Sequence, residues 1–116
     1  IVSVLVALLI LRSAWGIIVR TVHILMEGTP PAIDQEAVWR ALQEIDGVID
    51  VHDLHIWTIT SGLDSLSCHL LVEEDSSCRC QEILQQAIRL IEGRFRIEHV
   101  TIQVETPAIS HGQLKV

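Results

Sequence analysis

The sequence has 116 residues, a formal net charge of −7, 49% hydrophobic residues and a mean hydropathy of +0.42. This length suits one domain with a modest core. Nucleic acids are polyanionic and are bound by Lys and Arg, so the acidic balance excludes nucleic acid as a partner and favours cations. The odd cysteine count argues against a disulfide framework; the three are Cys68, Cys78 and Cys80.

The amino-terminal segment is strongly apolar. Residues 1–11 read IVSVLVALLIL, whereas a membrane-spanning helix needs about 20 apolar residues. We therefore interpret residues 1–26 as the C-terminal part of a transmembrane helix that begins earlier in the chain. Arg12, Trp15 and Arg20 follow the apolar run, which is typical of the cytoplasmic side and the interface. A buried core helix of a soluble protein is the alternative.

A stiff linker follows the apolar segment. One glycine and two prolines in MEGTPPAID cannot continue a helix, and almost all acidic residues lie beyond them. We predict a linker at residues 27–34, a domain at residues 35–106 and a tail at residues 107–116.

The domain begins with a predicted helix. Asp34 is placed as its N-cap, Val38, Leu42 and Ile45 share one helical stripe, and Gly47 is expected to close it.

A hairpin is predicted next. VIDVHDLHIWTIT and LSCHLLVEE are rich in strand-forming residues and flank the turn SGLDS. Val51 and Leu54 are three residues apart, so they cannot share a face of a regular strand. Either a bulge lies near Asp53 or the regular strand begins after it.

A second helix and a third strand complete the pattern. DSS (residues 75–77) is expected to cap the helix and Gly93 to end it, with one apolar face made of Cys80, Leu84, Ala87 or Ile88, and Ile91. In the strand HVTIQVE, alternate apolar residues point one way and His99, Thr101, Gln103 and Glu105 form a wet face. The sequence thus predicts an α+β, ferredoxin-like α-β-β-α-β domain with two helices on one face of a three-stranded sheet.

Histidines and carboxylates on the strands raise the question of a metal site. His52 lies at the entrance of the first strand, and His69 lies on the wetter face of the second with Ser67 and Glu73. Imidazole nitrogen and carboxylate oxygen are zinc ligands, but the spacings alone favour solvated sheet residues. The other candidates are given structural interpretations: Cys80 in the core, Cys78 at a helix start, His55 packed with Trp57, and His23 and His111 without a partner.

Three stretches together resemble a known family. ILMEGTPPAID, GVIDVHDLHIWTITSGLDSLSCHLLVEE and HVTIQVE, in this order, are similar to the cation diffusion facilitator family, especially its cobalt–zinc–cadmium efflux branch. The resemblance implies a proton-coupled antiporter rather than an enzyme, exporting Zn²⁺ or a related ion such as Co²⁺ or Cd²⁺. It also implies a homodimer in the inner (cell) membrane, multi-pass, with residues 1–25 in the lipid bilayer and residues 27–116 cytoplasmic.

The resemblance also assigns metal ligands. By position they are His52, His69 and Glu105, and relatives often carry two adjacent histidines where this chain has Glu98-His99. Glu98 is therefore the candidate fourth ligand, as a carboxylate that would favour slightly harder metals. The alternatives are a non-metal dimerisation or small-molecule-sensing module of a membrane protein, and a metallochaperone-like domain.

Overall fold

The computed structural model describes residues 1–73 and 79–107. Its elements follow the predicted order after an N-terminal helix, with a short π-helical turn, η2, added after the last helix. They are α1 (Val2–Leu25), α2 (Gln35–Gln43), β1 (Val48–Thr60), β2 (Leu63–Val72), α3 (Cys80–Leu90), η2 (Ile91–Phe95) and β3 (His99–Glu105).

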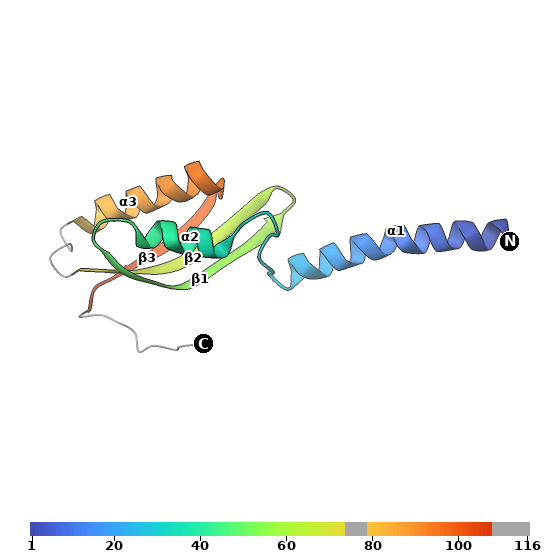
Figure 1. Cartoon of the computed structure of the whole chain (residues 1–116), viewed down its shortest axis with the longest axis horizontal. Helices are drawn as coiled ribbons and strands as arrows, with labels where there is room; N and C mark the ends of the chain where they lie inside the picture. The colour runs from blue at the N-terminus through green and yellow to red at the C-terminus, as the bar shows by residue number, and fades with distance from the viewer. Residues whose placement is uncertain (74–78, 108–116) are drawn as a thin grey trace.

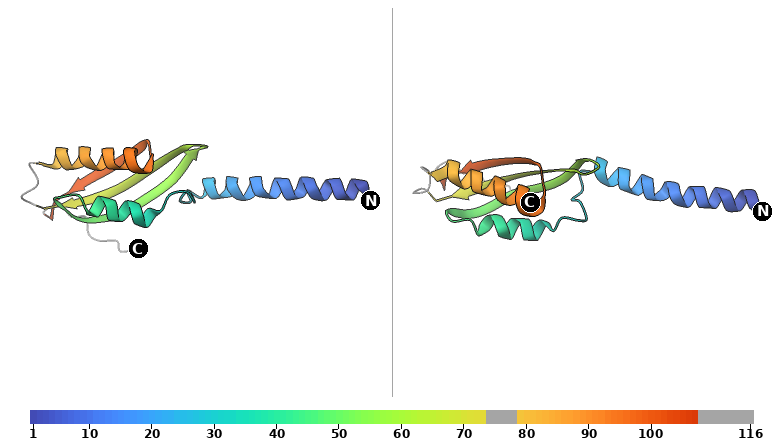
Figure 2. Two further views of the ribbon diagram at one scale, coloured as in Figure 1. Left: turned by 45° about the horizontal axis from the view of Figure 1, so that its top comes forward. Right: turned by 90° about the horizontal axis from the view of Figure 1, so that it is seen from above.

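The three strands form one mixed sheet in the order β1-β2-β3. A tight hairpin joins β1 and β2 antiparallel, and its turn uses Gly62 at φ +82°. Strand β3 pairs parallel to β2, which requires a crossover, and α3 supplies it. Helices α2 and α3 lie on the same face of the sheet (Figures 1 and 2). The predicted α+β class is confirmed, with two layers; the sheet face that no described helix covers is called the open face.

The hydrophobic core lies between the two helices and the sheet. Its fully buried members include Val38 and Leu42 from α2, Ile83 from α3, and Leu66 and Leu70 from β2. Helix α1 contributes no buried residue. The core is therefore complete without α1.

Helix α2 begins as predicted but ends earlier. The Asp34 side chain accepts hydrogen bonds from the amides two and three residues on, at 3.0 and 3.3 Å, which confirms the N-cap. The helix ends at Gln43, so Ile45 is buried beyond its last turn. Gly47, at φ +92°, turns the chain into β1 and does not close the helix.

Helix α3 differs from its prediction at both ends. It begins at Cys80, and the predicted cap at residues 75–77 lies outside the described residues. Ile83 is fully buried whereas Leu84 is only half-buried, so the core face is rotated from the predicted one. Gly93 does not end the helix, because the chain continues through η2 and turns at Arg96, which has a left-handed φ of +57°.

Strand β1 contains the expected irregularity. His52 lies opposite His69, but His55 lies opposite Ser67, so two residues of β1 face a single residue of β2. Asp53, inside this bulge, has a left-handed φ of +51°. The bulge is confirmed, and the strand runs through it rather than beginning after it.

Helix α1 extends away from the sheet domain (Figure 1). Its 24 residues correspond to about 36 Å at 1.5 Å per residue, more than the hydrocarbon thickness of a bilayer. Of the described segments, α1 alone is long and apolar enough to cross a membrane.

The bulge gives a test of backbone strain. A left-handed φ costs a side-chain-bearing residue about 1–2 kcal/mol, more for a β-branched one, and costs glycine nothing. Asp53→Gly should therefore leave the free energy of unfolding equal or higher, whereas Asp53→Val should lower it by about 1–2 kcal/mol. Urea unfolding of a chain lacking residues 1–28 measures both. Equal midpoints for the two variants would show that the strain is absent.

Candidate metal centre

Three side chains from three strands meet on the open face of the sheet. The antiparallel register places His52 of β1 directly opposite His69 of β2. The parallel register brings Gln103 beside His69 and Glu105 beside Leu71. Alternation along β3 turns Glu105 to the same face, as the sequence predicts.

The three functional groups are close enough to share one ion. His69 Nδ1 lies 2.9 Å from Glu105 Oε1, and His52 Nε2 lies 3.5 Å from Glu105 Oε2. The two imidazole rings meet edge to face, with centroids 5.3 Å apart. One ligand atom from each residue lies within 4.8 Å of the other two, and no other such group occurs in the described part of the chain.

The carboxylate of Glu105 is the most constrained member. Only 3% of its side chain is exposed, so the expectation of a wet position is wrong for this residue. Its Oε1 accepts a hydrogen bond from Gln103 Nε2 at 2.8 Å. Its Oε2 is buried and receives no hydrogen bond from the described residues. A buried acceptor without a donor costs about 1–3 kcal/mol, so this oxygen is available to a cation.

The donor set fits zinc. Two imidazole nitrogens and a carboxylate oxygen bind Zn²⁺ at about 2.0–2.2 Å, which in a tetrahedral site separates ligand atoms by about 3.4 Å. The ligand atoms lie within 4.8 Å of one another, so a contraction of at most about 1.4 Å would reach that geometry. His69 Nδ1, now beside Glu105 Oε1, would have to be free of its proton to bind, so metal and proton compete for this atom.

The predicted fourth ligand lies elsewhere. Glu98 is exposed and precedes the first residue of β3, whereas Glu105 is the last, so the strand separates them by roughly 23 Å. Within one chain, Glu98 is not brought to the cluster. Asp50, which the sequence analysis missed, has Oδ2 4.0 Å from His52 Nδ1. Asp50 could have been found from the sequence, because it lies two residues before His52 and alternation places both on the same strand face.

The remaining histidines have other surroundings. His55 is exposed, so its predicted packing is wrong; it lines a hollow of about 350 Å³ near the linker together with Trp57. His23 Nε2 is 3.0 Å from the Thr29 carbonyl oxygen, which gives it the partner that sequence could not name. His111 and Cys78 lie outside the described residues.

The described cysteines lie on the other side of the sheet. Cys80 is half-buried against the core, as predicted. Cys68 is 1% exposed on the helix-covered face, and burial raises the pKa of its thiol to about 12. A protonated buried thiol is a poor metal ligand.

The comparisons with known proteins place the chain in a family. Residues 30–107 match the family described as "Cation efflux protein, cytoplasmic domain". The chain belongs to this family, the cation diffusion facilitators.

Full-length relatives agree with this assignment. The chain is 44% identical over 109 residues to a "Cadmium, cobalt and zinc/H(+)-K(+) antiporter" of Bacillus velezensis, covering 94% of this chain. It is 35% identical over 104 residues to the "Metal cation efflux system protein CzcD" of Cupriavidus metallidurans, covering 90% of this chain. The chain spans only 35% and 33% of the length of these two relatives.

Solved structures confirm the ferredoxin-like fold. The "Metal-bound C-terminal domain" of CzcD from Cupriavidus metallidurans matches with a TM-score of 0.58 and 36% identity, over 63% of this chain and 99% of that one. The zinc form of "a Putative Zinc Transporter CzrB" matches with a TM-score of 0.60 and 26% identity, over 73% and 97%.

The position of Cys68 predicts low thiol reactivity. In a chain lacking residues 1–28, with Cys78→Ser and Cys80→Ser, a thiol reagent should modify Cys68 at least about 100-fold more slowly than in denaturing guanidinium chloride, because thiolate is the reactive form. Since the raised pKa is about 12, the protection should persist as pH rises past 9. Equal rates in native and denatured protein would place Cys68 at the surface.

Proposed function

We propose that this chain is the C-terminal part of a proton-coupled Zn²⁺ efflux transporter, with Co²⁺ and Cd²⁺ as further substrates, and that its cytoplasmic domain senses metal. The observation that carries the proposal is the cluster of His52, His69 and Glu105, with a buried carboxylate oxygen that lacks a donor. Family membership and the names of the transporter relatives support it. The transported ion would bind in membrane helices outside this chain.

The membrane placement rests on α1. In the proposed arrangement α1 crosses the inner membrane as the last span of a multi-pass protein, and residues 27–116 are cytoplasmic. Trp15 and Arg20 lie in the half of α1 nearer the domain, and Arg12 lies close to its midpoint, after the apolar run; this order supports that orientation. The proposed boundaries remain residues 1–26, 27–34, 35–106 and 107–116.

A homodimer is proposed because the sheet has one open face. The metal cluster lies on this face, so a second copy could approach it about a two-fold axis. Two acidic domains repel each other, and a cation at their contact would offset that repulsion. Zinc bound by three protein ligands has a fourth coordination position that is open to another ligand. Glu98 could occupy that position only from a second copy of the chain. Metal would then favour the paired arrangement by its differential affinity.

The zinc proposal predicts a thermal shift in the domain lacking residues 1–28. If only the folded state binds, free Zn²⁺ at 100 times Kd adds about 2.7 kcal/mol, which raises the Tm by about 10 °C or more for a domain of this size. The shift should shrink at acid pH, because protonated imidazole cannot ligate.

Variants locate the site. His52→Ala with His69→Ala should abolish the shift, whereas His55→Ala, an exposed histidine on the same strand, and Cys78→Ala should preserve it. A shift of full size in the double variant would move the metal elsewhere. A missing shift in the unaltered domain would leave a dimerisation module that binds no metal.

The dimer proposal predicts self-association of the same domain. Sedimentation at micromolar concentration should show a dimer that strengthens with Zn²⁺ and weakens in Glu105→Gln, which keeps the side-chain shape and removes the charge. A monomer in both metal-free and zinc-saturated buffer would contradict the proposal.

A further inference from the structure

Strand β1 is an edge of the sheet, so the outer carbonyl groups beside its bulge have no strand partner. Two side chains of α2 supply the missing donors. Trp39 Nε1 donates to the Val51 carbonyl oxygen at 2.8 Å, and Gln35 Nε2 donates to the Leu54 carbonyl oxygen at 2.9 Å. The two donors are one helical turn apart, on one face of α2.

These two hydrogen bonds hold the carbonyl groups that flank one dipeptide of β1. That dipeptide is His52-Asp53, the metal-ligand candidate followed by the residue in the left-handed conformation. A bulge aims the side chains beside it. Holding the carbonyls of Val51 and Leu54 in place therefore fixes the direction in which His52 leaves the strand.

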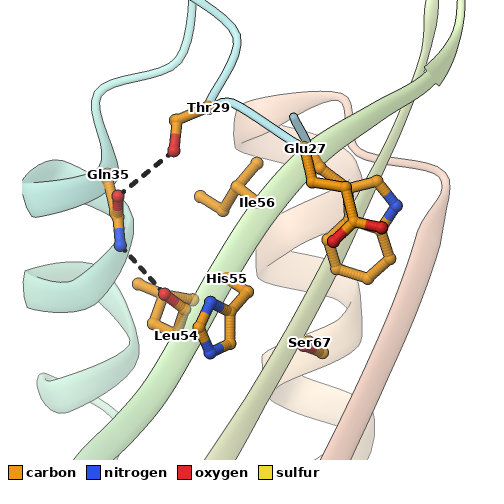
Figure 3. Close-up of a pocket in the computed structure, with 8 residues that line it drawn as sticks. Glu27, Thr29, Gln35, Leu54, His55, Ile56 and Ser67 are labelled. Carbon is orange, nitrogen blue, oxygen red and sulfur yellow. Dashed lines mark hydrogen bonds between the residues drawn. The ribbon is translucent and has the colours of Figure 1, made fainter. Parts of the chain in front are cut away.

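The Gln35 amide also contacts the linker. Its Oε1 accepts from Thr29 Oγ1 at 3.4 Å, and Figure 3 shows the side chain bridging Thr29 and Leu54. The Thr29 carbonyl oxygen is in turn 3.0 Å from Nε2 of His23, in the last turn of α1. One amide thus connects the bulge through its nitrogen and the linker through its oxygen.

The linker is closely packed at this junction. A Cβ added to Gly28 would lie 2.3 Å from a ring carbon of His23, so the imidazole rests against the glycine backbone. The end of α1 is therefore seated against the linker that Gln35 holds.

We propose that Gln35 is a positioning residue for the metal ligand His52, and that its amide ties the geometry of the metal site to the linker leading to α1. The inference rests on the proposed zinc site. Ordering of the bulge by metal would then reach the linker through Gln35.

The test separates the two ends of the amide in the whole chain, held in detergent micelles. Gln35→Glu keeps the acceptor for Thr29 but removes the donor to Leu54. Thr29→Val removes only the linker contact. Gln81→Glu makes the same substitution in the first turn of α3, at an exposed position, and is the matched control.

Three measurements are made on each variant: the zinc Kd, the visible absorption of bound Co²⁺, and amide hydrogen exchange of the metal-free chain. Gln35→Glu should raise the Kd about 10-fold, as is typical for the loss of a ligand-supporting contact. It should also shift the Co²⁺ band and speed exchange at residues 51–55 and 26–34. Its added negative charge would by itself attract zinc, so weaker binding cannot come from that charge.

The other variants have distinct expected patterns. Thr29→Val should speed exchange at residues 26–34 while leaving the Kd and the Co²⁺ band unchanged, and Gln81→Glu should leave all three readouts unchanged. Native Kd and Co²⁺ absorption in Gln35→Glu would overturn the positioning role. Native exchange at residues 26–34 in metal-free Gln35→Glu would overturn the tie to the linker.

The proposed function fails in a different way. If the unaltered chain binds neither Zn²⁺ nor Co²⁺, the zinc site is wrong. The metal-free exchange measurements still decide whether Gln35 holds the bulge and the linker together.

Discussion

The architecture depends on the bulge at Asp53 and Leu54, the middle one of three register shifts along β1. Val51 and Ile56 are both core residues, 4% and 2% exposed, yet they are separated by an odd number of positions. In a regular strand such residues point to opposite faces. The bulge at Asp53 and Leu54 corrects the phase, so both halves of the strand present their apolar side to the helices. With Val51 in the core, His52 must lie on the open face opposite His69.

The polar side chains around Glu105 explain how a buried carboxylate is tolerated. Glu105 lies where the three strands each contribute a polar side chain, and the imidazoles and the Gln103 amide surround it. One of its oxygens is satisfied and the other is not. Burying an ionised group is costly unless it is paired. A cation bound between the histidines would remove that cost. The contacts that bind the metal would therefore also stabilise the folded domain.

Sequence reasoning succeeded where a local pattern fixed the structure. The Asp34 cap, the bulge near Asp53 and the alternation of β3 follow from short-range rules, and each is present. It failed at the end of α3, because the turn at Arg96 uses a residue type that rarely adopts a left-handed φ. Glycine at position 93 was the more obvious signal and was wrong.

For the metal site, the sequence could identify the candidate residues but could not show that their side chains lie close together. The spacings of His52, His69 and Glu105 contain no local metal motif, and only the resemblance to a family singled out the three. The strand register brings them together, and it also separates Glu98 from them along β3. The burial of Glu105 could not be read from its alternating neighbours, because it depends on the side chains of two other strands.

The origin of the three ligands on three strands bears on how the domain folds. The outer strands are joined only through the middle one, and β3 follows the crossover helix in the chain. The complete ligand set therefore exists only when the sheet is complete, so an ion held by all three ligands binds the folded sheet. Interactions absent from the folding transition state slow unfolding and leave the folding rate unchanged. If β3 pairs with β2 only after that transition state, zinc bound by all three ligands would slow the unfolding of this domain without speeding its folding.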